Sequence, residues 1–432
     1  MLFSLEDVME YVEENDVKFI RLVFFDIFGS MKNISIIASE LPKALEFGVT
    51  FDASEIKGFM NIGESDLLLR PDPTTAEILP WRPQHSRVLR IFCDICYPDG
   101  RPFEGDSRNI LKSVTRELKD MGYTCDIGSE SKFYLFELNE YGLPTKKPHD
   151  MGTYYDVAPA DRGENIRREI CLTLEEMGIQ PETSHHDEGP GQHEIVFRHS
   201  APIEAADHLM TFKNMVKTIS DMNGLFASFM PRPLENQSGN AFHVNVSMYD
   251  KDGKGVLDSD SEAGRSFIAG VLRRVNEMCL FLNPTTNSYG RFGQFEAPLY
   301  VTWSLENRQQ LIRIPKNLSG EGRMELRSPD GAANPYLVYA LVLSAGMEGL
   351  RDGLKLCEPI NVTYKSDIEG LTRLPKNLEA AVRFAESSEF LKAVLPGNIL
   401  NTYIKQKREE YAGYMKATNK EGYESKLYFG SM

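Results

Sequence analysis

The sequence predicts an α+β fold with a small N-terminal domain over residues 1–102 and a larger domain over residues 103–432. Helical spacing and strand-like alternation are mixed along the chain, which favours this class. The 432 residues exceed one typical core, and 41% hydrophobic with 26% charged residues is typical of an ordinary globular protein. We expect the larger domain to carry a curved, mainly antiparallel sheet flanked by helices.

The N-terminal domain is expected to begin with a helix and to continue with strands. A capping-box-like Ser4-x-x-Asp7 starts a stretch with apolar residues at helical spacing, which predicts a helix over residues 4–15. β-rich runs on either side of Phe28-Gly29-Ser30 indicate a hairpin. The expected strands cover residues 18–27, 31–37 and 88–96, and a turn follows at Pro98-Asp99-Gly100.

Helical and strand-like patterns alternate through the larger domain. The predicted helices cover residues 108–121, 163–177, 203–222 and 262–281, and two more are expected within 376–414. The predicted strands cover residues 125–138, 193–197, 240–248 and 310–314. The longest apolar run, 336–347, is far shorter than the roughly 20 residues of a membrane-spanning helix, so we interpret it as a buried helix.

Composition and charge exclude several classes of partner. A formal net charge of -15 lacks the basic footprint that nucleic-acid binding needs, so an anionic small substrate would need a local basic pocket. The first 15 residues are acidic and contain no apolar signal core, from which we expect a cytoplasmic protein without a membrane partner. The six cysteines are scattered, and we interpret the isolated Cys93-x-x-Cys96 as structural.

The segment Arg323-Met324-Glu325-Leu326-Arg327 sets three charges at every second position. In a β-strand these three side chains share one face, and the two apolar residues pack on the other. Arginine presents a fork to phosphate or carboxylate oxygens, and a glutamate between two arginines can ligate a hard cation. The pattern therefore indicates a polyanion bound with a metal ion; a solvated charge stripe on an edge strand is the alternative.

Two further segments concentrate charges, and each also has a plain structural interpretation. Glu130 and Lys132 share one face of a predicted strand, where they could form an exposed ion pair. Residues 185–194 gather histidines and carboxylates around a Gly-Pro-Gly break. Such a loop can bring metal ligands together, or it can be a solvated acidic loop.

A strand and a loop add more polar groups. His243 lies in a predicted strand whose polar side chains alternate onto one face, although a lone histidine is often an ordinary core or surface residue. The glycine- and proline-rich stretch 283–298 carries Arg291 and Glu296. Its composition suits a mobile lid as well as a plain connector.

Ordered motifs run through the second half of the chain: Asn283-Pro-Thr, Asn287-Ser-Tyr, Glu296-Ala-Pro, Asn307-Arg308, Ile312-Arg-Ile-Pro315, Arg323-x-Glu325-x-Arg327 and Ala332-Ala-Asn-Pro-Tyr336. Near the N-terminus, the loop that begins Phe51-Asp52-Ala-Ser-Glu55 looks like an Asp-Gly-Ser-Ser loop. In order and spacing these motifs resemble the glutamine synthetase family, in its class I bacterial and archaeal form. The resemblance covers essentially the whole chain.

The resemblance implies both an architecture and an activity. It implies a β-grasp-like N-terminal domain, a catalytic larger domain, and a homo-oligomer, a double-ring dodecamer, whose active sites are shared between subunits. The implied reaction joins ammonia to the γ-carboxylate of glutamate with ATP, through γ-glutamyl phosphate. This chemistry requires Mg2+ or Mn2+ and arginines to neutralise phosphate charge.

The resemblance also assigns site residues by motif. The implied metal ligands are Glu130, His243 and Glu325, with Asp187 and Glu194 at a second ion. The implied nucleotide contacts are Glu182, Phe197, Ser247, Arg308, Arg313 and Arg323. The implied substrate contacts are Gly239, Arg291, Arg327 and the flap residue Glu296. Catalysis would also involve Arg308, Asp187, Tyr154 in the ammonium pocket, and Asp52 reaching in from a neighbouring subunit.

The second metal site departs from the family pattern. Three glutamates are usual there, whereas this chain has Lys132, Asp187 and Glu194. A protonated lysine cannot ligate a metal. Three carboxylates around a divalent cation carry the same net charge as these two carboxylates with the Lys132 ammonium. We therefore hypothesise that the ammonium stands in for the ion; the alternative is that the substitution disables the enzyme.

Smaller departures leave the amine substrate open. The Asp-Gly-Ser-Ser loop becomes Asp52-Ala-Ser-Glu55, Arg232 replaces a lysine, and Ser238 replaces an asparagine near the substrate. Three hypotheses follow. The chain is a glutamate-ammonia ligase, a γ-glutamyl ligase acting on a polyamine or another primary amine, or a catalytically silent homologue with a regulatory or structural role.

Overall fold

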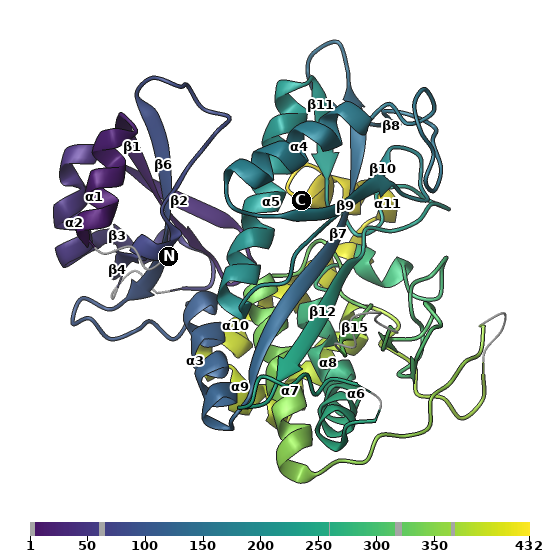
Figure 1. The fold of residues 1–432 in the computed structure, drawn as a ribbon. Helices are drawn as coiled ribbons and strands as arrows, with labels where there is room; N and C mark the ends of the chain where they lie inside the picture. Colours follow the sequence, from purple (N-terminus) through teal and green to yellow (C-terminus); the bar gives the residue numbers. More distant parts are fainter. Residues whose placement is uncertain (1–4, 60–64, 259, 316–321, 364–367) are drawn as a thin grey trace.

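The computed structural model of the protein describes residues 5–59, 65–258, 260–315, 322–363 and 368–432. The described chain forms two sheets, one near the N-terminus and a larger one that most of the helices surround (Figure 1). Ser4, which opens the first predicted helix, lies outside the described residues. The α+β class is confirmed.

A six-stranded mixed sheet with two helices forms the N-terminal part, with strand order β2-β1-β6-β4-β3 and with β5 paired to β6. Its elements are α1 (Leu5–Glu14), β1 (Val17–Phe25), β2 (Met31–Ile37), α2 (Leu41–Phe47), β3 (Val49–Asp52), β4 (Asp66–Pro71), β5 (Glu77–Ile78) and β6 (Arg87–Cys96). β1 runs antiparallel to β2 and parallel to β6. Gly29, with φ of +81°, makes the expected hairpin turn.

The larger domain contains a nine-stranded sheet with strand order β13-β14-β15-β12-β7-β10-β9, and both β8 and β11 pair with β7. Its strands are β7 (Thr124–Leu138), β8 (Pro144–Pro148), β9 (Pro181–His186), β10 (Gln192–Phe197), β11 (Leu225–Ser228), β12 (Phe242–Tyr249), β13 (Trp303–Ser304), β14 (Ile312–Arg313) and β15 (Met324–Leu326). The β13–β14 pair is parallel and the other pairs are antiparallel. The curved, mainly antiparallel sheet is therefore confirmed.

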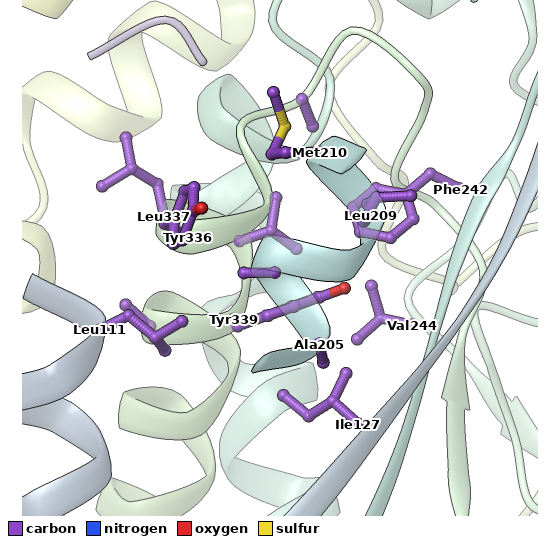
Figure 2. Close-up of a cluster of buried hydrophobic side chains, with 14 of the residues drawn as sticks. Leu111, Ile127, Ala205, Leu209, Met210, Phe242, Val244, Tyr336, Leu337 and Tyr339 are labelled. Atoms are coloured by element: carbon purple, nitrogen blue, oxygen red, sulfur yellow. The ribbon is translucent and has the colours of Figure 1, made fainter. Parts of the chain in front are cut away.

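Helices cover one face of this sheet (Figure 1). They are α3 (Ser107–Asp120), α4 (Glu164–Glu176), α5 (Pro202–Met222), α6 (Glu262–Leu282), α7 (Pro335–Asp352), α8 (Leu378–Glu386), α9 (Glu389–Val394), α10 (Gly397–Lys416) and α11 (Lys420–Glu424). Figure 2 shows residues of α5 such as Ala205 and Leu209 in one buried cluster with the sheet residue Val244 and Tyr339 of α7. The apolar run 336–347 lies inside α7 and is buried, as expected. None of the helices in the described ranges is long and apolar enough to cross a membrane.

The structure corrects one element prediction. Residues 376–414 contain three helices rather than two, because Ser388 ends one stretch and caps the next by accepting a hydrogen bond from the Leu391 amide. The predicted strand at 323–327 is present but is limited to Met324–Leu326. The six cysteines are free thiols, and Cys93 and Cys96 are buried in β6.

A buried arginine joins the two parts of the chain. Arg108, at the start of α3, is 2.9 Å from Asp72, 2.6 Å from Asp94 and 2.9 Å from Asp207. The first two aspartates belong to the N-terminal part and the third belongs to α5. The guanidinium therefore ties the small sheet to the helical layer of the larger domain.

Candidate active site

A cavity of about 730 Å³ lies over neighbouring strands of the large sheet, in the order β9, β10, β7, β12, β15 and β14. The strand register explains why polar side chains meet there. His243 is paired with Glu130, and Lys132 is paired with Glu194. Glu325 is paired with Arg313 on its other side. Because side chains alternate along each strand, these partners project onto the same face of the sheet.

Glu130, His243 and Glu325 form a compact group whose ligand atoms all lie within 4.8 Å of one another. The Nδ1 atom of His243 lies 3.1 Å from Glu130 and 3.5 Å from Glu325. Glu130 also accepts a hydrogen bond of 2.9 Å from Asn245. Two carboxylates and an imidazole form a donor set that suits a divalent cation such as Mn2+. These residues therefore fit a metal site.

The protonation states of this group also suit a metal. Burial alone would raise the pKa of Glu130, but the hydrogen bond and charge of His243 outweigh burial and hold that pKa below its usual value. The pKa of Glu325 is also lowered, because the Arg327 and His243 charges outweigh burial. Burial and Arg327 lower the pKa of His243. Ionised carboxylates and a neutral imidazole are the forms that bind metal.

Arginines surround the buried Glu325 carboxylate. The Nε atom of Arg313 donates a 2.6 Å hydrogen bond to one of its oxygens, and Arg327 donates to the other. The Nε atoms of Arg291, Arg323 and Arg327 are buried and have no hydrogen-bond partner among the residues that the structure describes. Buried donors without partners are costly, so this end of the cavity is suited to anionic oxygens.

Lys132 occupies the position between two carboxylates. Its Nζ atom lies 2.6 Å from Asp187 and 3.3 Å from Glu194. These carboxylates outweigh burial and raise the pKa of Lys132 above its usual value. Burial raises the pKa of Glu194 to about 7. The carboxylates already hold an ammonium, so this group does not fit a second divalent cation while Lys132 is protonated.

A buried polar network supports the hairpin that carries Asp187 and Glu194. Its members are Asp150, Asp161, Arg167, His186 and His193. Arg167 donates 2.7 Å and 3.1 Å hydrogen bonds to Asp161 and contacts His193 at 2.9 Å. His186 lies 2.9 Å from Asp150 and 2.7 Å from the next residue's carbonyl. Because Arg167 already supplies a cation, we interpret this network as a support for the hairpin.

Gly239 and Arg291 lie against each other at the wall of the cavity. A Cβ atom on Gly239 would lie 2.6 Å from Cγ of Arg291 and 2.7 Å from the Pro231 carbonyl oxygen. Arg291 donates a 3.1 Å hydrogen bond to the Ser328 carbonyl and lies 3.7 Å from Asp330. Only glycine therefore leaves the guanidinium in this position.

The stretch 283–298 is anchored at its start and exposed near its end. Asn287 accepts a 2.6 Å hydrogen bond from the Arg232 amide, which fixes the first turn. Glu296 is about half exposed and reaches Arg327 at 3.5 Å. A loop that is anchored at its start and exposed at its tip over the cavity has the arrangement of a flap.

Most of the residues predicted for the site line this one cavity: Glu130, Tyr154, Glu182, Asp187, Glu194, Gly239, His243, Arg291, Glu296, Arg308, Arg313, Arg323, Glu325 and Arg327. Three do not. Phe197 is buried against Phe212, Ser247 is buried in β12, and Asp52 lies at the exposed end of β3, where it accepts a hydrogen bond from Ser54. Their roles stay predictions.

The segment 185–194, which the sequence singled out as a whole, also brings to the site residues to which no individual role was assigned. His185 lies two positions before Asp187, and strand alternation puts both on the cavity side. Glu188 lines the cavity near Ser238. Gln192 does not line the cavity, but it supports the wall by donating 3.1 Å hydrogen bonds to the Gly239 carbonyl and to Asn240. The alternation around Asp187 could have identified His185, whereas no local sequence signal marks Gln192.

The fold and the cavity define an α+β enzyme whose candidate active site combines a group of side chains that fits a metal ion with arginines suited to anions. Two family models match the chain: "Glutamine synthetase, beta-Grasp domain" over residues 16–98 and "Glutamine synthetase, catalytic domain" over residues 104–426. The chain belongs to the glutamine synthetase family.

Curated relatives and solved structures agree with this assignment. The chain is 43% identical over 425 residues to a glutamine synthetase of Clostridium saccharobutylicum, covering 95% of this chain and 96% of the relative. It is 44% identical over 422 residues to a glutamine synthetase of Methanosarcina mazei, covering 95% and 94%. A solved structure described as a GmaS/ADP complex superposes with a TM-score of 0.87 at 28% identity, covering 98% of this chain and 99% of that one.

Proposed function

We propose that the chain is an ATP-dependent glutamate-ammonia ligase that forms γ-glutamyl phosphate and releases glutamine. One observation carries the proposal: Glu130, His243 and Glu325 form a group that fits a metal ion, beside arginines whose buried Nε atoms have no hydrogen-bond partner in the described chain. A phosphoryl transfer to a carboxylate requires this pairing of metal and arginine. The relatives named glutamine synthetase support the same activity.

The proposed roles follow from position in the cavity. Glu130, His243 and Glu325 would hold Mg2+ or Mn2+, which would neutralise charge on the transferred phosphoryl group. Arg308, Arg313 and Arg323 would bind phosphate oxygens, and Glu182 would lie at the nucleotide end. Arg291 and Arg327 would hold the substrate carboxylates beside Gly239, with the Glu296 flap closing over them.

The amine side of the site is proposed to be completed by a second subunit. Tyr154 lines the cavity, and burial beside Tyr155 raises its pKa to about 12. Asp52 does not line the cavity of its own chain but lies at the exposed end of β3. An exposed carboxylate on the small domain can enter a neighbour's cavity. We therefore keep the proposal of a dodecamer in which Asp52 of one subunit binds the ammonium ion of another.

We propose that Lys132 replaces a second metal ion. Its ammonium contacts Asp187 at 2.6 Å and Glu194 at 3.3 Å, so it balances the carboxylates that a divalent ion would otherwise bridge. The adjacent Glu130 group keeps its full ligand set. The enzyme would then work with one exchangeable divalent ion and with the ammonium group of Lys132 in place of the second ion.

Phosphate release tests the proposed activity. Purified protein is incubated with ATP, glutamate, ammonium and either Mg2+ or Mn2+, and both phosphate and glutamine are quantified. We expect equal amounts of both products. Glu130→Gln should abolish release, and Glu140→Gln, at an exposed turn far from the cavity lining, should not change it. A well-folded protein that releases no phosphate under any of these conditions contradicts the proposal and favours the silent homologue.

A γ-glutamyl-amine ligase is the second candidate. The structural similarity to GmaS and the additional carboxylate Glu188 beside Ser238 in the cavity favour it. A carboxylate there could recognise a second amino group of a polyamine. The same assay with a panel of primary amines separates the candidates. A kcat/KM for one amine that exceeds that for ammonium by more than about tenfold, roughly 1.4 kcal/mol, would replace the first proposal with the second.

A further inference from the structure

A second cavity, of about 370 Å³, lies between the β1–β2 turn, α5 and α10. Four lysines line it, namely Lys57, Lys213, Lys217 and Lys407, together with one carboxylate side chain, Glu410. We call it the lysine pocket. It shares no lining residue with the active-site cavity. Such a concentration of positive charge is unusual in a chain whose net charge is -15.

The Glu410 carboxylate forms an ion pair with only one of these lysines among the residues that the structure describes. Glu410 forms an ion pair of 3.0 Å with Lys407 and accepts a 2.5 Å hydrogen bond from Tyr428. Lys213 donates to the Gly331 carbonyl at 2.6 Å, and Lys217 donates to the Ser431 carbonyl at 3.3 Å. Within the described ranges, no carboxylate lies within ion-pair distance of Lys213 or Lys217.

Helix geometry places Lys213 and Lys217 together. They are four residues apart on α5, so both point from one face of the helix into the pocket. Like charges at this spacing repel each other. Lys57 and Lys407 lie across the pocket, each 5.5 Å from the centre of the Phe28 ring. Lysines from three separate parts of the chain therefore line one cavity.

The pKa values of the helix lysines reflect mainly their burial. Burial, with a further contribution from the charge of Lys217, lowers the pKa of Lys213 to about 7, and the charge of Asp330 offsets only part of that shift. Burial lowers the pKa of Lys217 to about 8. An anion in the pocket would restore both ammonium groups and remove the cost of burying them unpaired.

We propose that the lysine pocket binds a small tetrahedral oxyanion, namely a phosphate group. The ammonium of lysine is a compact point charge that suits phosphate from any direction, whereas planar carboxylates favour the fork of arginine. The pocket contains lysines and no arginine among its described lining residues, in contrast to the active site. Its volume accommodates inorganic phosphate or a small phosphomonoester. The site does not depend on the proposed ligase activity.

Calorimetric titration of phosphate into the full-length protein tests this site. The Arg323→Gln variant is titrated first, because that substitution weakens binding of phosphate at the active site but leaves the lysine pocket intact. In this background, Lys217→Gln and Lys57→Gln should each weaken binding by about tenfold or more, since each removes a charge-assisted contact. Lys57 is exposed at the mouth, so its variant should fold normally. Lys119→Gln, at an exposed position on α3, is the matched control and should bind like its parent.

A crystal of the unaltered protein grown with arsenate locates the anion without any variant. We expect an anomalous peak between Lys213, Lys217 and Lys407. Glycerol 3-phosphate is titrated in parallel with inorganic phosphate. Tighter binding of either ligand supports the site and shows whether the bound phosphate group comes from free phosphate or from a phosphomonoester. Three results would overturn the proposal: binding that Lys57→Gln and Lys217→Gln leave unchanged, arsenate found at the active site alone, or malonate binding as tightly as phosphate.

Discussion

Glu325 shows how a single side chain organises the active site. One of its oxygens accepts a 2.6 Å hydrogen bond from Arg313, and the other is bonded to Arg327 and lies 3.5 Å from His243. The sequence predicted this arrangement, because alternation in a strand places Arg323, Glu325 and Arg327 on one face. It could not predict that Arg313 joins them, because that contact depends on the pairing of two short strands.

Lys132→Glu should create a second metal site. Replacing the ammonium with a carboxylate gives Asp187 and Glu194 a third acidic neighbour, a ligand set that a divalent cation can use. Equilibrium dialysis with Mn2+ should then find two ions per chain in the variant and one in the unaltered protein.

The matched control is Lys119→Glu, which makes the same charge change at an exposed position on α3 and should leave one ion per chain. Two ions bound by the unaltered protein would show that Lys132 does not replace a metal. Restored glutamine synthesis in Lys132→Glu from an inert parent would instead identify the natural chain as a silent homologue.

At the scale of elements, the sequence predicted the long β7, the hairpin at Gly29 and the buried α7 from alternation and apolar spacing. It did not predict three helices within 376–414, because the break at Ser388 depends on a single capping hydrogen bond. Short strands such as β13 and β14 have only two residues each, too few for a periodic signal.

Gly239→Ala should weaken glutamate binding more than it changes turnover. The new Cβ would meet Cγ of Arg291 at 2.6 Å and would push the guanidinium from its position. Steady-state kinetics should show a KM for glutamate at least about tenfold higher. Gly397→Ala, where a Cβ meets nothing within 4 Å, should behave like the unaltered enzyme. An unchanged KM in Gly239→Ala would remove Arg291 from the proposed substrate site.

Glu77→Gln should stabilise the N-terminal sheet at neutral and higher pH. Burial raises the pKa of Glu77 to about 7, although the charge of Arg90 opposes the shift. The folded state therefore holds a proton that the unfolded state releases near the ordinary glutamate pKa of 4.5. As pH rises from about 4.5 to 7, the unaltered protein loses stability, on the order of 1–3 kcal/mol, that the glutamine variant keeps.

Thermal melting at several pH values tests whether the glutamine variant is the more stable protein at neutral and higher pH. The melting temperature of Glu77→Gln should exceed that of the unaltered protein at pH 8, and the difference should shrink towards pH 5. Glu14→Gln, an exposed change on α1, should show no such trend. A difference that grows as the pH falls would contradict the assignment.

At the scale of the whole molecule, the sequence predicted an N-terminal part and a larger part but not what connects them. The connection is Arg108, whose three aspartate partners come from positions 72, 94 and 207. No local pattern marks such a long-range cluster. The same limit applies to the lysine pocket, which α5, α10 and the β1–β2 turn form together.

Arg108→Met should destabilise the whole protein. It would leave the buried Asp207 without its Arg108 partner and would leave Asp72 and Asp94 with Lys112 alone, and breaking a buried ion pair by removing one partner costs about 3–5 kcal/mol. The melting temperature should fall by about 10 °C or more. Arg116→Met, an exposed change two turns further along α3, should leave it within about 1–2 °C. Equal melting temperatures for the two variants would show that the cluster does not hold the domains together.

Phosphorylation of the γ-carboxylate of glutamate in the active-site cavity can be followed by the transfer of an isotope. Glutamate carrying 18O in its γ-carboxylate is supplied with unlabelled ATP and ammonium, and the released phosphate is analysed by mass spectrometry. Breakdown of γ-glutamyl phosphate by the amine leaves one carboxylate oxygen on phosphorus, so each phosphate released with glutamine should contain one 18O. Glutamine formation with unlabelled phosphate would contradict the proposed acyl phosphate.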